Sequence, residues 1–96
     1  MTKLSLMLGE SLNVSFGEAL KAVRSDRGLS ARGLSEQCDL SPAYISKVEN
    51  GTSVPSARVF SRILKELDCN LVEIAFLVGI LMREEKLTRE SNESKS

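Results

Sequence analysis

Signals for the start of a helix recur at short intervals along this chain, and they restrict its fold more than any other feature. Ser15, with Glu18 three residues later, has the spacing of a capping box, in which the two side chains satisfy backbone N–H groups at a helix start. Ser30 precedes a second such segment, and Ser41 is followed by Pro42, which is favoured at the first helical position. A chain divided in this way is expected to form several short helices.

Apolar residues recur at helical spacing after each of these signals. Gly28 and Gly51 suit helix ends, and Asp39 tolerates the left-handed backbone of a tight turn. We therefore predict an all-α fold, a compact bundle of about five helices over residues 16–27, 31–38, 42–50, 57–67 and 71–87, the last one capped by Asn70 with Glu73. The inward residues predicted for the first four helices are Phe16, Ala19, Leu20, Val23, Leu34, Cys38, Ile45, Val48, Phe60, Ile63, Leu64 and Leu67.

The 96 residues suffice for a single domain. Residues 1–14 fit both a helical and an alternating pattern, and we expect an N-terminal arm or short helix there. Residues 15–87 form the predicted folded domain. The polar residues 88–96 are predicted to be a disordered tail.

Several classes of protein are excluded by what the sequence lacks. It has no histidine, no glycine-rich phosphate loop and no cluster with metal-ligand spacing, so we expect no enzyme, no catalytic residues, no metal and no cofactor. The longest apolar run, residues 74–82, is too short to span a membrane, which takes about 20 residues. No secretory signal is evident, and Cys38 and Cys69 fall in apolar patterns as free thiols would. A cytoplasmic location is predicted.

The segment "GLSARGLSEQCDLSPAYISKVENG" followed by "VPS" resembles the lambdoid repressor and Cro group of helix-turn-helix proteins, the XRE family. The residues that carry the resemblance are Leu34, Leu40, Ser41, Ile45, Ser46, Glu49, Gly51, Pro55 and Ser56. The resemblance implies a lambda-repressor-like fold and a bacterial or phage-encoded transcription regulator that binds double-stranded DNA. Its recognition helix would be residues 42–50. Ala31, Ser35 and Asp39 depart from the residues that are common in the family, and Arg32 is the candidate to replace a phosphate contact that is missing at Ala31.

The face of this helix opposite Ile45 and Val48 is expected to contact DNA. The predicted base contacts are Pro42, Ala43, Tyr44, Ser46 and Lys47. The predicted phosphate contacts are Arg32, Ser41, Asn50, Thr52, Ser53 and Arg58. By resemblance, Arg24 pairs with Glu49 in a structural ion pair that fixes the recognition helix.

The fifth helix is apolar on more than one side, which indicates a homodimer. Its inward stripe is predicted to be Leu71, Ile74, Ala75, Val78 and Met82, and its dimer interface Phe76, Leu77, Ile80 and Leu81. The alternative is that residues 1–14 fold back over this surface. A two-fold dimer would present two recognition helices to a palindromic operator.

Charge leaves a second function open. Residues 16–70 carry eight basic and seven acidic side chains, a weak balance for a protein that neutralises phosphates. The alternative is an antitoxin-like or regulatory module that binds a protein partner and has little or no affinity for DNA. A DNA-binding regulator of this kind could also bind a second protein.

Overall fold

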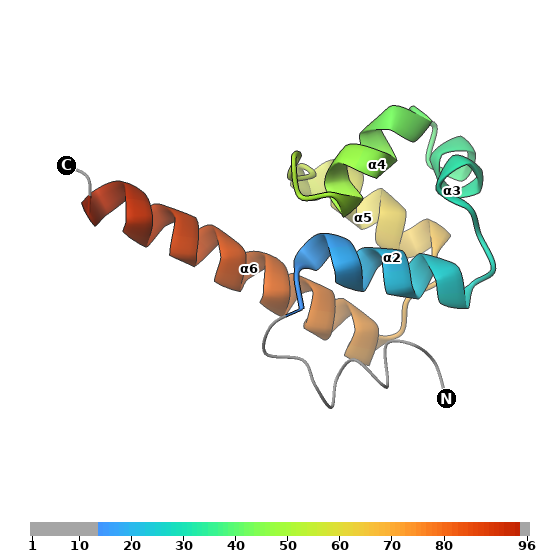
Figure 1. Ribbon diagram of the computed structural model, residues 1–96. Coiled ribbons are helices and arrows are strands. Elements are labelled where there is room, and N and C mark those ends of the chain that lie inside the picture. The colour runs from blue at the N-terminus through green and yellow to red at the C-terminus, as the bar shows by residue number, and fades with distance from the viewer. Residues whose placement is uncertain (1–13, 95–96) are drawn as a thin grey trace.

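The chain folds into a bundle of helices (Figure 1). The computed structural model describes residues 14–94, and the side chains of residues 14–85. The helices are α2 (Phe16–Asp26), α3 (Ala31–Gln37), α4 (Pro42–Glu49), α5 (Ala57–Glu66) and α6 (Leu71–Ser94). No strand occurs among the described residues, and the all-α prediction is confirmed. The predicted arm lies outside the described residues, apart from Val14.

Side-chain caps begin all five helices of the described residues. Four serine hydroxyls accept a hydrogen bond from the backbone N–H three residues on, at 2.9 to 3.2 Å; they are those of Ser15, Ser30, Ser41 and Ser56. At α6 the capping box is complete, because Asn70 Oδ1 accepts from the Glu73 N–H and Glu73 Oε1 accepts from the Asn70 N–H. The caps satisfy N–H groups that have no partner within the helix, which explains why the helix starts follow the sequence signals.

The core lies where α2 meets the other helices. Eleven of the twelve inward residues predicted for the first four helices are buried, and Leu64 is partly buried against them. The rings of Phe16 in α2 and Phe60 in α5 pack edge to face with centroids 5.3 Å apart. Helical periodicity therefore identified the packed faces of α2 to α5 correctly.

The packed face of α6 differs from the prediction. Leu77 and Ile80, predicted as dimer contacts, are 0% and 5% exposed in the core of the same chain. Leu71 and Met82, predicted to face inward, are 83% and 64% exposed, and Ala75 is exposed as well. Both assignments were wrong for these residues because apolar side chains surround α6, and its pattern alone does not select a face.

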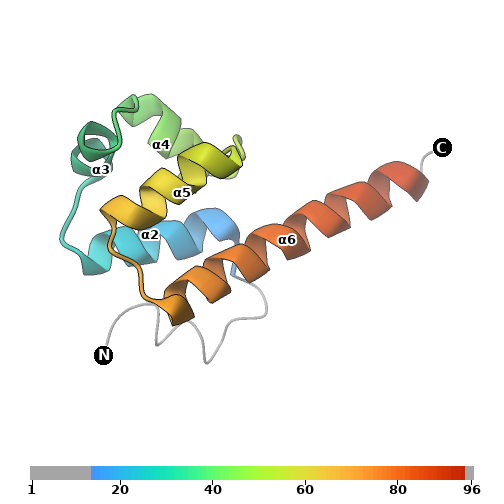
Figure 2. The ribbon, with the colours of Figure 1, turned by 180° about the vertical axis from the view of Figure 1, so that it is seen from behind.

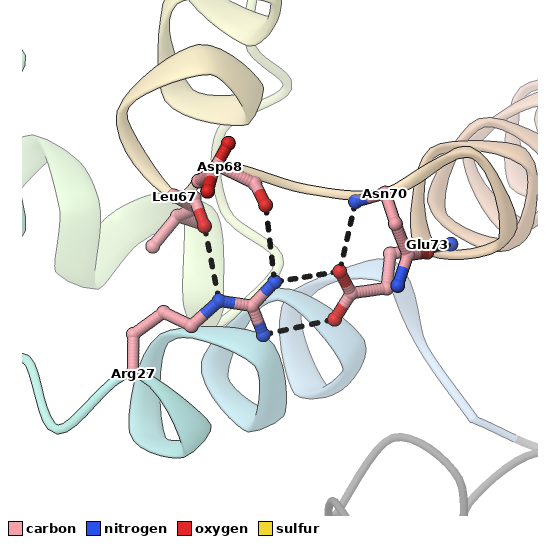
Figure 3. A network of polar contacts seen from close by, with 5 residues as sticks. All are labelled: Arg27, Leu67, Asp68, Asn70 and Glu73. Carbon is pink, nitrogen blue, oxygen red and sulfur yellow. Dashed lines mark hydrogen bonds and ion pairs between the residues drawn. The ribbon is translucent and has the colours of Figure 1, made fainter.

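An ion pair between α6 and Arg27, the residue that follows α2, accounts for the observed face of α6 (Figure 3). Arg27 Nη1 and Nη2 donate to the two carboxylate oxygens of Glu73 at 2.9 and 2.6 Å, and Nε donates to the Leu67 carbonyl at 3.0 Å. The Arg27 guanidinium holds the pKa of Glu73 below its usual value. Because Glu73 must face Arg27, Leu77 and Ile80, one and two turns further on, face α2 as well.

The other end of α2 is also joined to α6. The N–H of Phe16 donates to Glu84 Oε1 at 2.8 Å, and Arg83 Nη2 donates to the Val14 carbonyl at 2.9 Å. A carboxylate at this position is favoured by the positive end of the α2 dipole. Two glutamates of α6 therefore hold the two ends of α2.

Helix α6 continues beyond the rest of the fold (Figures 1 and 2). It reaches Ser94, whereas the sequence analysis ended it near Leu87 and predicted a disordered tail from residue 88. No glycine or proline follows Gly79, and leucine, arginine and glutamate in this stretch favour a helix. No helix in the described part of the chain has the length and apolarity that a membrane span requires.

Candidate nucleic-acid interface

Helices α3 and α4 form the helix-turn-helix unit. The turn between them runs through Asp39, whose φ of 56° lies in the left-handed region, as predicted for this residue. The Leu40 N–H donates to the Ser35 carbonyl at 2.8 Å and closes the end of α3. This turn sets the angle at which α4 leaves α3, and the two helices pack directly on each other.

Ser35 lies at the centre of this unit. Its side chain is fully buried, and its hydroxyl donates to the Arg32 carbonyl at 2.6 Å. The family commonly has alanine at this position, and the hydroxyl is the only polar group that serine adds to it. The hydrogen bond satisfies that hydroxyl. The departure from the family at Ser35 therefore leaves the packing of α3 on α4 intact.

Helix α4 has one buried and one exposed face. Ile45 and Val48 are 0% and 1% exposed and attach the helix to the core. Tyr44 is half-buried at the margin, where it packs against the core. The remaining side chains predicted to reach bases are exposed: Pro42, Ala43, Ser46 and Lys47. In both ribbon views α4 lies at the edge of the bundle (Figures 1 and 2).

An ion pair fixes the end of α4 to α2. Arg24 Nε donates to Glu49 Oε2 at 2.7 Å and Nη2 donates to Glu49 Oε1 at 3.0 Å, while Nη1 donates to the Leu29 carbonyl at 2.7 Å. The two side chains are 10% and 7% exposed. This is the Arg24–Glu49 ion pair that the family resemblance implied, and it holds the recognition helix in place. It neutralises Glu49, which would otherwise present a negative charge beside the exposed face of α4.

The polar residues around α4 differ in their capacity to donate a hydrogen bond. Ser41 accepts from the Tyr44 N–H, which leaves its hydroxyl proton free for a ligand. Thr52 already uses both its hydroxyl and its N–H to bond the Lys47 carbonyl, at 3.1 and 2.8 Å. Asn50 is exposed and Ser53 is half-buried. Among the hydroxyls, Ser41 is therefore better prepared than Thr52 to hold an anion.

Two exposed arginines lie on α3 and α5, the helices before and after α4. Arg32 of α3 bonds Glu36 at 3.3 Å, but the two side chains are 81% and 69% exposed. An ion pair as exposed as this one contributes little and can open. Arg58 lies exposed in the first turn of α5. Both guanidinium groups are therefore accessible to an anion from the solvent.

Taken together, the turn, the exposed face of α4 and its buried supports define a helix-turn-helix DNA-binding protein. The chain belongs to the helix-turn-helix family whose model matches residues 20–74, more than half of its length. Proteins of this XRE type regulate transcription, and that coarse class holds for this chain.

Solved structures agree with this assignment. One crystal structure of the clp gene regulator ClgR from Corynebacterium glutamicum is 27% identical, with a TM-score of 0.60, and the match covers 69% of this chain and 86% of that one. A second crystal structure of ClgR is 26% identical, also with a TM-score of 0.60, and the match covers 82% of this chain and 88% of that one. A search of curated protein sequences finds no match.

Proposed function

We propose that the protein is a sequence-specific regulator of transcription that binds double-stranded DNA as a homodimer, with α4 in the major groove of each half of a palindromic operator. The observation that carries this proposal is the exposed face of α4, whose opposite face is held rigidly by Ile45, Val48 and the Arg24–Glu49 pair. The likeness to ClgR supports a role in transcription.

Base recognition is assigned to Pro42, Ala43, Tyr44, Ser46 and Lys47. Lys47 can donate to the O6 and N7 of guanine, and the methyl group of Ala43 can contact the methyl group of thymine. Ser46 can donate or accept, whereas Pro42 offers apolar contact only. The bases are therefore recognised through few hydrogen bonds, and Lys47 is expected to contribute most to sequence specificity.

Phosphate binding is assigned to Arg32 and Arg58 at the sides and to Ser41, Asn50, Thr52 and Ser53 near the ends of α4. The N–H groups at the start of α4 and α5 favour anions in the same region. For Thr52 the contact requires the release of the Lys47 carbonyl, so we rank it below Ser41. With so few cations, one copy binds weakly, and two copies on one duplex supply the affinity.

A two-fold dimer places its recognition helices about 34 Å apart, one turn of B-DNA.

The experiment that tests the proposal is selection of sequences from random duplex DNA by the full chain. The affinity of the selected sequence is then measured as the salt concentration rises. A palindromic sequence with half-sites one turn apart, whose affinity falls steeply with salt, is the expected result. Absence of any enriched sequence at low salt contradicts the proposal and favours the module that binds a protein partner.

A further inference from the structure

The first turn of α2 is a junction at which three other helices meet. The ring of Phe16 packs on Phe60 of α5. The backbone of Gly17, the next residue, lies against the last carbonyl groups of α4, so closely that a Cβ atom would collide with them. From α6, Glu84 accepts a hydrogen bond from the Phe16 N–H at 2.8 Å. A displacement of this turn would therefore be transmitted to the recognition helix.

Helix α6 determines where this turn lies. The two helices run side by side in opposite directions (Figures 1 and 2). Arg27, directly after α2, binds Glu73, and Phe16 at the start of α2 binds Glu84. In each helix the two contacts lie eleven residues apart, which is about 16 Å along the axis and close to three full turns. Both glutamates therefore lie on the side of α6 that faces α2, and they fix the register of α2 at its two ends.

The end of α4 is likewise attached to α2 at two points. Gly17 lies against its backbone, and Arg24 holds the Glu49 side chain through hydrogen bonds of 2.7 and 3.0 Å. Gly17 and Arg24 are about two turns apart and lie on the same side of α2. Because both contacts hold the same end of α4, a shift or tilt of α2 moves the recognition helix with it.

The bond from Phe16 to Glu84 has no substitute in the neighbouring cap. The Phe16 N–H belongs to the first turn of a helix, where no carbonyl of the same helix can accept it. The Ser15 hydroxyl already accepts from the Glu18 N–H. Glu84 is half-buried, and the adjacent Arg83 donates to the Val14 carbonyl at 2.9 Å. Two successive residues of α6 thus hold the backbone on both sides of Ser15.

We propose that Glu84 is a positioning residue for DNA binding, which fixes the distance and tilt at which α4 meets the major groove. It acts by holding the first turn of α2 on α6, and its effect passes through Phe16 and Gly17 to the end of α4. The proposal rests on the proposed function, because it concerns the same recognition helix. Glu84 itself lies on α6 and is assigned no contact with DNA.

The test compares Glu84→Ala with Glu85→Ala, which removes the same side chain from the next, exposed position of α6. Affinity is measured at low salt for a duplex with one half-site of the selected operator and for a random duplex. A single half-site keeps the pairing of two copies out of the measurement. Glu84→Ala is expected to lose about twofold to thirtyfold of its preference for the half-site, the range of couplings carried through packed elements, whereas Glu85→Ala keeps it. A loss of folded protein would lower both affinities alike and leave the preference unchanged.

A second variant and a second readout make the test specific. Glu84→Gln keeps an oxygen that can accept from the Phe16 N–H and is expected to retain the preference. The amide NMR signals of Gly17 and of the last residues of α4 need no DNA. They are expected to move in Glu84→Ala and to stay in place in Glu84→Gln and Glu85→Ala. If Glu84→Ala does not fold, Arg83→Ala tests the same junction, because it removes the bond to the Val14 carbonyl.

The two readouts separate this inference from the proposed function. A wild type that binds no selected DNA overturns the proposed function, and the NMR signals still test whether Glu84 positions α4. Unmoved α4 signals in Glu84→Ala, or an unchanged preference for the half-site, overturn the inference. A Glu84→Gln variant as impaired as Glu84→Ala also overturns it, because the effect would then depend on the charge and not on the hydrogen bond.

Discussion

Gly17 of α2 lies directly beneath the backbone of Glu49 at the end of α4. A Cβ atom at Gly17 would lie 2.6 Å from the Glu49 carbonyl carbon and 2.8 Å from the Val48 carbonyl oxygen. The obstructing atoms belong to the backbone, which cannot move aside as the end of a flexible side chain can. The close approach of α2 to the recognition helix therefore depends on the absence of a side chain at residue 17.

Gly17→Ala is expected to lower the free energy of unfolding by about 1–3 kcal/mol, because α4 must move away from α2 to make room. Urea unfolding at a concentration where the chain is monomeric measures this change. The matched control is Gly79→Ala, whose added methyl group meets nothing within 4 Å and which is expected to stabilise the helix by about 0.5–1 kcal/mol. Equal stability of Gly17→Ala and the wild type would show that α4 is not held at this distance.

Glu73→Gln is expected to destabilise the fold by about 3 kcal/mol. The change leaves Arg27 without its charged partner, and the value lies at the low end for buried pairs because Arg27 is still 25% exposed. Chemical unfolding at neutral pH gives the measurement. Glu66→Gln, at an exposed position of α5, serves as control and should change stability by less than about 0.5 kcal/mol. A loss no larger than that of the control would mean that the pair does not stabilise α6 on α2.

The same pair predicts how stability changes in acid. The pKa of Glu73 is lowered in the folded protein, chiefly by the hydrogen bonds from Arg27, relative to an ordinary value of 4.5. A carboxylate with a lowered pKa contributes stability that is fully present above the ordinary value and is lost as the pH falls through the folded value. Between about pH 6 and about pH 3, the wild type should lose more stability than Glu73→Gln. Parallel curves for the two proteins would contradict this.

Lys47→Ala is expected to weaken binding to the selected operator by about 1–3 kcal/mol, or roughly fivefold to 150-fold. Because Lys47 is exposed, the unfolding temperature of the Lys47→Ala variant should match that of the wild type. Fluorescence anisotropy with a labelled duplex measures the affinity. Lys65→Ala removes an exposed lysine near the end of α5 and controls for the loss of one positive charge. If both variants bind alike, Lys47 has no specific contact with the operator.

Local signals predicted much of this fold because their causes are local. A serine caps the helix that directly follows it, and Asp39 adopts its turn through its own backbone preference, so neighbouring residues suffice to place both. The Arg24–Glu49 pair was anticipated from the family resemblance and not from local rules. The contacts with DNA assigned to α4 remain predictions that only binding experiments can test.

The orientation of α6 was not predictable in the same way. It is set by the contact between Arg27 and Glu73, which lie 46 residues apart in the sequence, and Glu73 was interpreted only as a capping residue. The need for a glycine at residue 17 was missed for a similar reason. It arises from the backbone of Val48 and Glu49 in α4, which follows much later in the chain. Both features depend on which helices meet, and a pattern within one helix does not contain that information.

Helix α2 packs against both α4 and α6. Arg24 in its last turn binds Glu49, Arg27 directly after the helix binds Glu73, and the N–H of Phe16 at its start binds Glu84. In a homodimer whose interface lies on α6, where the sequence analysis predicts it, the path from one recognition helix to the other passes twice through α2. The distance between operator half-sites would then be a property of the contacts at the ends of α2, separate from the base sequence that α4 recognises. Related regulators could diverge in operator spacing through changes at these contacts while they keep the same half-site.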